Sequence, residues 1–420
     1  MDLSSRLREI STGFTRTFWV ANVLELFERL AFYGAKAVLA VYLATKVGLK
    51  EEAGSLAGLF SGVIFSLPIV AGVFVDRYGF RKTLIACFAM FCVGYFLIGL
   101  AGLEIGQGLV NAIGVKLYII VVLILTAVGG SLIKPCIVGT VAKTAKPDTK
   151  SLGFSIYYTL VNLGGAVGPI LALEVRENLG IEFVLVTSSI TSFLLMVGAF
   201  LFFKEPEYFD GVEHQRASFG KVFRDMLLVF GNVRFISFLV IFSGFWTMFW
   251  QIFYSYPFYV TDILKFPRFE ILETVDAWTI IIVSVPITAL VKKRAPITAM
   301  TLGFLIASAS WIIIGASPTV TAAIIGTGMF AIGEATQAPR FYEYVSSLAP
   351  REQVGTFMGF AFLPVAIGSF VAGPLADWLR ASYLQTNPAM MWYTLAAVGF
   401  GSTVLMLLYN VLVARKSAGA

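Results

Sequence analysis

The chain has 420 residues, of which 58% are hydrophobic and 13% are charged, and its mean hydropathy is +0.84. Soluble proteins average about 45–50% apolar and about 25% charged residues, so this composition excludes a soluble enzyme, a disordered protein and an extracellular disulfide scaffold. What remains is an all-α membrane protein with several membrane-spanning helices.

Twelve apolar segments follow one another along the chain, and each approaches the roughly 20 residues that a helix needs to cross a bilayer. We expect spans near 17–45, 53–75, 83–103, 113–142, 153–176, 182–203, 233–263, 273–291, 296–316, 318–347, 353–379 and 388–413. An even number of spans places both termini on one side, and the loops of that side carry most of the Lys and Arg residues. Basic loops face the cytoplasm, so we predict a cell-membrane protein with both termini cytoplasmic. The net charge of +6 then reflects the basic residues of the cytoplasmic loops, and no nucleic-acid partner is expected.

The first expected span contains four charged residues, Glu25, Glu28, Arg29 and Lys36. Each charge at a helix centre costs roughly 2.5–3.5 kcal/mol, which is on the order of 10–14 kcal/mol for all four. At about 100° per residue, Glu25, Arg29 and Lys36 share one narrow stripe, with Tyr33 on or near it. We therefore expect the stripe to face a polar cavity or to pair internally, and the i,i+4 spacing of Glu25 and Arg29 favours pairing.

The loop between spans two and three reads GVFVDRYGFRK, residues 72–82. It resembles the signature loop of the major facilitator superfamily, which latches helices together during the conformational cycle. The matching residues are Gly72, Asp76, Arg77, Gly79, Arg81 and Lys82. Gly79 permits a tight turn, and Asp76 can pair with a basic group or a helix end. The alternative is an ordinary basic loop.

Few other ionisable groups lie inside the expected spans. Lys134 in span four and Glu334 in span ten have no opposite charge three or four residues away, which favours a function over a structural ion pair. Arg340 and Glu343, further along span ten, can form such a structural pair. Polar and aromatic candidates accompany them at Tyr158, Asn162, Trp250, Gln251 and Gln337. The three cysteines and the single histidine lack metal-ligand spacing, so no metal site is expected.

The longest polar stretch separates spans six and seven and divides the chain. We expect a six-helix half at residues 1–204, a cytoplasmic linker at 205–232 and a second six-helix half at 233–420. Apolar residues recur at helical spacing in the later part of the linker. This pattern predicts a helix on the membrane surface, or a loop that packs on the bundle.

The two halves repeat each other's landmarks. Offsets of 204 or 205 positions relate Gly129 to Gly333, Pro135 to Pro339, Gly168 to Gly373 and Pro169 to Pro374. Similar offsets at two separate places indicate an internal repeat. Two like-oriented six-helix halves, with a substrate site between them near the membrane midplane, are the layout of the major facilitator fold.

Several segments together resemble the proton-dependent oligopeptide transporter family, a branch of that superfamily. They are ELFERLAFYG in span one, LIKPCIVGTV in span four, GFSIYYTLVNLGG in span five, and GEATQAP followed by LAPREQVGTFMGFAFL in spans ten and eleven. Members of this family import di- and tripeptides together with protons. The resemblance implies a major facilitator fold and transport by alternating access.

The resemblance also implies roles for individual residues. Proton coupling falls to Glu25, Glu28, Arg29 and Lys134, whose pairings would change as protons load. The predicted substrate-binding residues are Arg29, Tyr33, Lys36, Lys134, Tyr158, Asn162, Trp250, Gln251, Glu334 and Gln337. Among these, Arg29, Lys36 and Lys134 would hold the peptide carboxylate. Glu334 would hold the amino terminus, and Tyr158 and Asn162 would hold the peptide backbone.

The departures from the family pattern include Trp250 and Arg340. Trp250 precedes Gln251 at a place where the family usually has an acidic residue that contributes to proton coupling or gating. Asp276 in span eight could substitute for it, although we expect Asp276 near the membrane edge. Arg340 stands where the family commonly has a small or apolar residue, and its charge could alter the ligand.

We therefore expect a secondary active transporter that imports di- or tripeptides, or similar zwitterionic solutes, by proton symport. It would need no cofactor beyond the proton as coupling ion, and it would work as a monomer in the lipid bilayer. One alternative is a major facilitator exporter of a drug or metabolite by proton antiport, and a second is a membrane sensor that does not transport. An enzyme is not expected, because the sequence lacks HExxH, Walker and nucleophilic-serine motifs.

Overall fold

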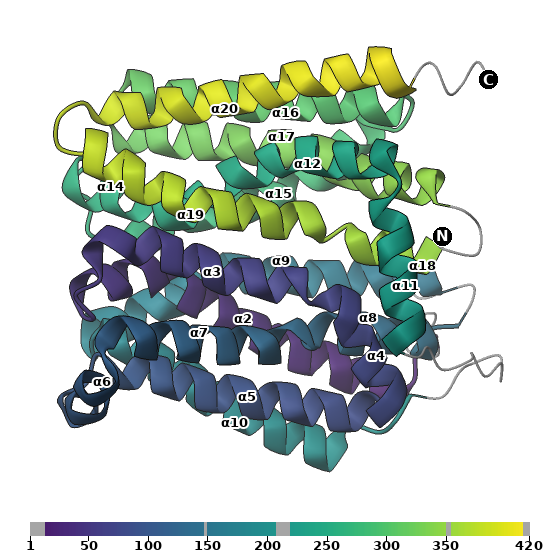
Figure 1. The fold of residues 1–420 in the computed structure, drawn as a ribbon, viewed down its shortest axis with the longest axis horizontal. Coiled ribbons are helices and arrows are strands. Elements are labelled where there is room, and N and C mark those ends of the chain that lie inside the picture. Colours follow the sequence, from purple (N-terminus) through teal and green to yellow (C-terminus); the bar gives the residue numbers. More distant parts are fainter. Residues whose placement is uncertain (1–12, 147–148, 207–218, 350–353, 415–420) are drawn as a thin grey trace, which may run out of the picture. The chain divides into compact units, whose positions relative to one another are not determined.

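The computed structural model describes residues 13–146, 149–206, 219–349 and 354–414, and all regular elements in these residues are helices (Figure 1). This confirms the all-α class. The two ends of the chain, whose cytoplasmic location is predicted above, lie outside the described residues, as do residues 207–218 of the expected linker.

Most expected spans are single helices, and their ends lie within about four residues of the predicted bounds. They are α2 (Arg16–Thr45), α5 (Phe80–Leu100), α9 (Lys150–Asn178), α10 (Ile181–Phe202), α15 (Phe269–Val291), α16 (Pro296–Ala316), α17 (Val320–Leu348) and α20 (Pro388–Tyr409), which η4 (Asn410–Ala414) extends. Short additional helices are η1 (Lys50–Glu52), η2 (Glu104–Gly106) and α6 (Gln107–Ile113).

The other four expected spans are broken into consecutive helices. They are α3 (Ala53–Ser66) with α4 (Pro68–Tyr78), α7 (Val115–Ser131) with α8 (Ile133–Thr144), α12 (Val233–Phe249) with α13 (Gln251–Tyr254) and α14 (Tyr256–Asp262), and α18 (Val354–Phe360) with α19 (Leu363–Tyr383). Pro68, Pro135, Pro257 and Pro364 each lie within the first three residues after a break. Proline has no N–H to donate to the preceding turn, so the helical hydrogen-bond ladder is interrupted there. The bend between α3 and α4 is 50°.

Among the described residues, nine helices are long and apolar enough to cross a membrane, or ten when the bent pair α3 and α4 counts as one span. α2 and α17 have 30 and 29 residues but carry the charged residues of the candidate site, which lowers their apolar character. The structure therefore describes a multi-pass membrane protein, and the number of twelve spans stays a prediction.

The helices pack as two units whose boundary crosses α2. One unit contains the described residues within Met1–Ala35 and Leu67–Val222, and the other contains those within Lys36–Ser66 and Phe223–Ala420. Residues 36–66, which include the turn of the first helical hairpin, therefore pack with the second half of the sequence. The division into halves at 1–204 and 233–420 stays a prediction about the sequence repeat.

Repeated glycines lie at equivalent helix crossings within each unit. A Cβ on Gly129 of α7 would lie 2.5 Å from Cβ of Met90 in α5. A Cβ on Gly333 of α17 would lie 2.7 Å from the backbone oxygen of Gly303 in α16. Both distances are too short for a side chain, so glycine lets the fourth helix of each half contact the third. The two glycines that are 204 positions apart thus have the same role in helix packing.

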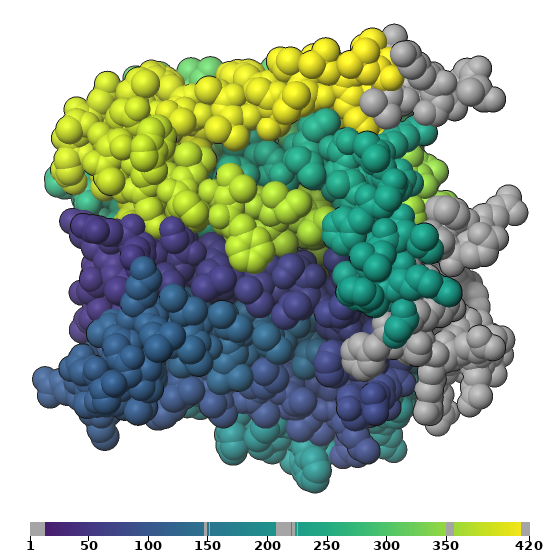
Figure 2. All heavy atoms as spheres, viewed as in Figure 1, coloured from purple at the N-terminus to yellow at the C-terminus, as the bar shows by residue number. Residues whose placement is uncertain are grey.

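A helix is present in the described part of the linker, as expected. This helix, α11 (Phe219–Phe230), lies at the surface of the view in Figure 2. Phe223 and Leu227 are exposed, whereas Val229 is buried. The ring of Phe230 packs at 5.2 Å, centroid to centroid, on that of Phe360. Contact of the exposed apolar residues with a membrane surface stays a prediction.

Candidate functional site

Four charged side chains of the first unit form one buried network. Glu25, Glu28 and Arg29 of α2 are 0%, 2% and 3% exposed. The Arg29 guanidinium pairs through Nε with Glu28, and its Nη2 donates to Glu28 Oε1 at 2.7 Å. The same Nε lies 3.5 Å from Glu25 Oε1, and Lys134 Nζ of α8 lies 3.3 Å from that oxygen. Two carboxylates and two cations thus balance each other's charge inside the first unit.

Tyr157 of α9 completes this network, and sequence reasoning missed it. Lys134 Nζ donates to the Tyr157 hydroxyl oxygen at 2.7 Å, and Tyr157 is buried. The predicted residue, Tyr158, is 52% exposed. Adjacent helical residues point about 100° apart, so only one of the two tyrosines can face Lys134. Asn162 is four residues beyond Tyr158 and therefore lies on the same face of α9 as Tyr158.

Aromatic rings of α2 cover the arginine of the network. Arg29 Cζ lies 4.6 Å from the Phe32 ring centroid and 5.9 Å from the Tyr33 ring centroid. A desolvated cation over an aromatic face gains about 2 kcal/mol or more. Tyr33, a predicted binding residue, therefore lies beside Arg29.

Lys36 lies in the other packing unit, among rings of the seventh expected span. Its Nζ is 3.5 Å from the Phe253 ring centroid, 4.5 Å from that of Trp250 and 5.1 Å from that of Phe249. The resemblance groups Lys36 with Arg29 and Lys134, and its role as a ligand of the substrate carboxylate stays a prediction.

Trp250 and Gln251 make structural contacts with α19. Trp250 Nε1 donates to the Val365 backbone oxygen at 3.0 Å, and Gln251 Nε2 donates to that of Ala372 at 3.0 Å. The Ser255 hydroxyl donates to Gln251 Oε1. Both ends of the Gln251 amide are thus engaged within the second unit, and contact of these two residues with substrate stays a prediction.

The carboxylate expected to bind an amine has free hydrogen-bonding capacity. Within the described part of the chain, Glu334 Oε2 and Gln337 Oε1 of α17 are buried without a hydrogen-bond partner. In contrast, Arg340 pairs with Glu343 and also donates to the Arg294 backbone oxygen. The structural ion pair expected for Arg340 is therefore present.

The predicted latch loop forms the expected tight turn. Gly79 has φ +85° between α4 and α5, a conformation that favours glycine. The helix end at this turn is capped by Glu205, which sequence reasoning missed. Its carboxylate accepts from the backbone N–H of Phe80 at 2.6 Å and of Arg81 at 3.0 Å. Asp76 is exposed and interacts electrostatically with Lys143. The other latch residues are the partly buried Gly72 and the exposed Arg77 and Lys82.

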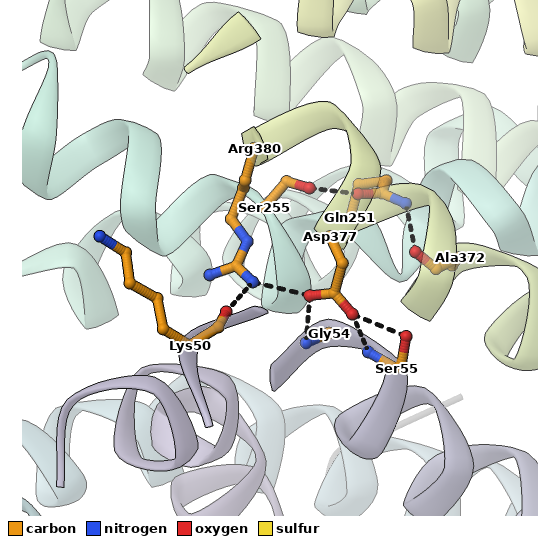
Figure 3. Close-up of polar contacts among 8 residues, drawn as sticks. All are labelled: Lys50, Gly54, Ser55, Gln251, Ser255, Ala372, Asp377 and Arg380. Atoms are coloured by element: carbon orange, nitrogen blue, oxygen red, sulfur yellow. Dashed lines mark hydrogen bonds and ion pairs between the residues drawn. The ribbon is translucent and has the colours of Figure 1, made fainter. Parts of the chain in front are cut away.

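A second carboxylate caps a helix in the other unit, where α3 runs beside α19 (Figure 3). Asp377 of α19 accepts from the backbone N–H of Gly54 at 2.8 Å and of Ser55 at 2.7 Å, and from the Ser55 hydroxyl at 2.6 Å. Arg380 donates to Asp377 and to the Lys50 backbone oxygen, at 2.6 and 2.7 Å. We call these contacts the α3–α19 clamp. Asp377 lies inside an expected span, so its charge alone could have singled it out.

Small residues let the two clamped helices approach closely. A Cβ on Gly54 would lie 2.7 Å from the Gly373 backbone oxygen, and one on Gly58 would lie 2.7 Å from that of Ser369. The Ser369 hydroxyl donates to the Gly58 oxygen at 3.0 Å. Gly373 is one of the repeated landmarks, so its place in the repeat is also a helix contact.

Apolar helices that shield buried charge from lipid define a multi-pass membrane protein with an internal polar site. The sequence matches the family model of the Major Facilitator Superfamily over residues 23–373, and the chain belongs to this superfamily. Its relatives are transporters and not enzymes.

Two relatives illustrate the range of similarity. The chain is 28% identical over 169 residues to a dipeptide and tripeptide permease B of Xenorhabdus bovienii, which is 39% of this chain and 32% of the permease. The alignment thus spans about a third of the permease. The chain is also 23% identical over 372 residues to the multidrug resistance protein MdtH of Klebsiella pneumoniae, and this alignment covers 87% of both proteins.

Solved structures share the fold over nearly the whole chain. A POT family transporter in complex with 5-aminolevulinic acid matches with a TM-score of 0.77 at 17% identity, covering 95% of this chain and 96% of that one. Another, in complex with a thioalcohol conjugated peptide, matches with a TM-score of 0.76 at 16% identity, covering 94% and 96%. Together with the family match, these likenesses confirm the major facilitator fold.

Proposed function

We propose that the chain is a secondary active transporter that imports di- or tripeptides, or similar zwitterionic solutes, by proton symport. The observation that carries this proposal is the buried network of Glu25, Glu28, Arg29 and Lys134. Similarity to dipeptide and tripeptide permeases favours a peptide as the zwitterion. The excess of Lys and Arg in the loops on one side favours cytoplasmic termini. The transporter works as a monomer in the bilayer.

Competition for the two cations couples substrate to protons. In the structure, Arg29 and Lys134 are neutralised by Glu28 and Glu25. A substrate carboxylate that binds either cation must displace one glutamate. An ionised carboxylate left buried without its partner is costly, so the displaced glutamate takes up a proton. Substrate and proton thereby favour the same state, as coupling requires.

The amine end of a peptide is assigned to Glu334 of the second unit. Its buried Oε2 has no hydrogen-bond partner in the described residues, and an ammonium group would satisfy it. A carboxylate site and an amine site on different halves suit a zwitterion, and the cycle is alternating access of the two halves around the substrate.

Uptake by reconstituted protein tests the proposal. Proteoliposomes with the acid side outside should accumulate a radiolabelled dipeptide, and collapse of the gradient should abolish accumulation. Glu334→Gln should abolish uptake, whereas Glu174→Gln, at an exposed position of α9, should leave it intact. Uptake that survives Glu334→Gln would refute the amine assignment.

Drug export is the second candidate, because the similarity to the multidrug resistance protein extends over 87% of both chains. Expression of an exporter makes cells more resistant to a toxic compound and does not give them peptide uptake. Growth with toxic compounds and peptide uptake, measured in the same strain, therefore separate the two functions.

A further inference from the structure

The second unit contains a lysine whose positive charge is enclosed by aromatic rings. Lys36 is 4% exposed, and its Nζ lies 3.5–5.1 Å from the ring centroids of Phe253, Trp250 and Phe249. Rings attract a cation without carrying a formal negative charge. The balance of charge around Lys36 therefore depends on the acidic residues that face it.

Those acidic residues come mainly from one face of α15. Glu270, Glu273 and Asp276 follow one another at spacings of three and are 0%, 3% and 8% exposed. Both carboxylate oxygens of Glu273, and Oδ1 of Asp276, are buried without a hydrogen-bond partner among the described residues. These two carboxylates therefore have oxygens that no described protein donor satisfies.

Other elements packed on α15 contribute further groups. α17 supplies Glu334, which interacts electrostatically with Asp276 and Lys36. α14 supplies Tyr256, whose hydroxyl accepts from Thr327 at 3.1 Å and which interacts electrostatically with Glu273. Lys36 also acts on Glu273 and Asp276.

Counting charges shows what this arrangement needs. Glu270, on the same helix, also acts electrostatically on Glu273. If Glu273, Asp276 and Glu334 were all ionised, three negative charges would share the positive charge of Lys36, with Glu270 as a further acidic neighbour of Glu273. Buried charge without compensation is strongly unfavourable. No group of three His, Cys, Asp or Glu side chains in the described part of the chain could hold a metal ion. Protonation of Glu273 and Asp276 would remove their negative charge without any further ligand.

We propose that Lys36, Glu273, Asp276 and Glu334 form a second proton-binding centre, in which Asp276 and Glu273 accept the proton. The reaction is transfer of a proton from a hydronium ion, which becomes water, to a carboxylate, which becomes a neutral carboxylic acid; the acid can return the proton to water on the other side of the membrane. Lys36 stabilises whichever carboxylate is ionised. As a coupling site for transport, this centre rests on the proposed function above, whereas proton binding does not.

Infrared difference spectroscopy tests proton binding without any substrate. Purified protein in lipid should show the C=O band of a protonated carboxylic acid that titrates with pH. Asp276→Asn or Glu273→Gln should reduce that band, Asp276→Glu should restore a titrating band, and Glu104→Gln, at an exposed position, should change nothing. Bands that remain the same in Asp276→Asn, Glu273→Gln and the double variant would overturn the proposal.

Transport in proteoliposomes tests coupling. Asp276→Asn should lower gradient-driven dipeptide accumulation about fivefold or more, since couplings of 5–150-fold are typical, while counterflow exchange without a gradient continues. Equal loss of accumulation and counterflow, with a raised KM, would make Asp276 a substrate ligand and refute the coupling role. If the parent protein transports no dipeptide but the acid band disappears in Asp276→Asn, the proposed function fails and the proton-binding centre stands.

Discussion

Asp377 binds Ser55 twice, through the backbone N–H at 2.7 Å and through the hydroxyl at 2.6 Å, although 322 positions separate the two residues in the chain. The α3–α19 clamp thus attaches the start of a helix in the first half of the sequence to the last but one span. Because a carboxylate at a helix N-terminus interacts favourably with the unsatisfied N–H groups and the helix dipole, the clamp stabilises this pair of helices.

Replacement of the clamp carboxylate should weaken the protein measurably. Asp377→Asn keeps the shape of the side chain but removes the negative charge that faces Ser55 and Arg380. Hydrogen bonds to charged groups contribute about 1.5–3 kcal/mol each, so we expect a clearly lower melting temperature in detergent. Glu51→Gln, at an exposed position next to the clamp, is the control. Equal melting temperatures for Asp377→Asn and the parent would contradict a stabilising clamp.

The close approach of α3 and α19 predicts a steric effect at Gly58. Alanine there would place a Cβ 2.7 Å from the Ser369 oxygen, so the helices must separate and the Ser369 hydrogen bond to Gly58 is strained. The matched control is Gly401→Ala in α20, where nothing lies within 4 Å of the new Cβ. Alanine in a helix is favoured over glycine by roughly 0.5–1 kcal/mol. We expect a lower melting temperature for Gly58→Ala and an unchanged or higher one for Gly401→Ala.

The pair of Glu25 and Lys134 should show strong coupling in a double-mutant cycle. Removing one partner of a buried ion pair costs about 3–5 kcal/mol, because the other charge stays buried. Lys134→Gln and Glu25→Gln should therefore each destabilise the protein, and the double variant should be more stable than the sum of the two predicts. Strictly additive changes in thermal stability would show that the two side chains do not interact.

The two adjacent tyrosines of α9 should respond differently to loss of the hydroxyl. Tyr157→Phe removes the hydrogen bond to Lys134 and should lower stability by about 0.5–1.5 kcal/mol. Tyr158→Phe should leave stability unchanged and alter the KM for a dipeptide, because Tyr158 is half-exposed and is predicted to contact substrate. A reversed pattern would show that the positions of the two side chains have been exchanged.

Hydrophobic spans, the Gly79 turn and the ion pair between Glu25 and Arg29 could all be predicted from the sequence, because each depends on local spacing. The same holds for the helix in the linker. Long-range partners could not be predicted in this way. Tyr157 reaches Lys134 through the rotation of α9, and Glu205 reaches Phe80 across 125 positions. The neighbours of Lys36 could not be predicted either. Lys36 shares a helical stripe with Arg29, but it packs with the second unit, which begins after Ala35.

The packing of residues 36–66 against α19 has a consequence for biosynthesis. At ribosomal rates of about 5–20 residues per second, the 322 residues between Ser55 and Asp377 take roughly 15–60 s to synthesise. During this interval, the glycine-lined face of α3 is in the membrane without its partner helix. Until α19 has been synthesised, this face of the first hairpin must therefore contact lipid or the insertion machinery.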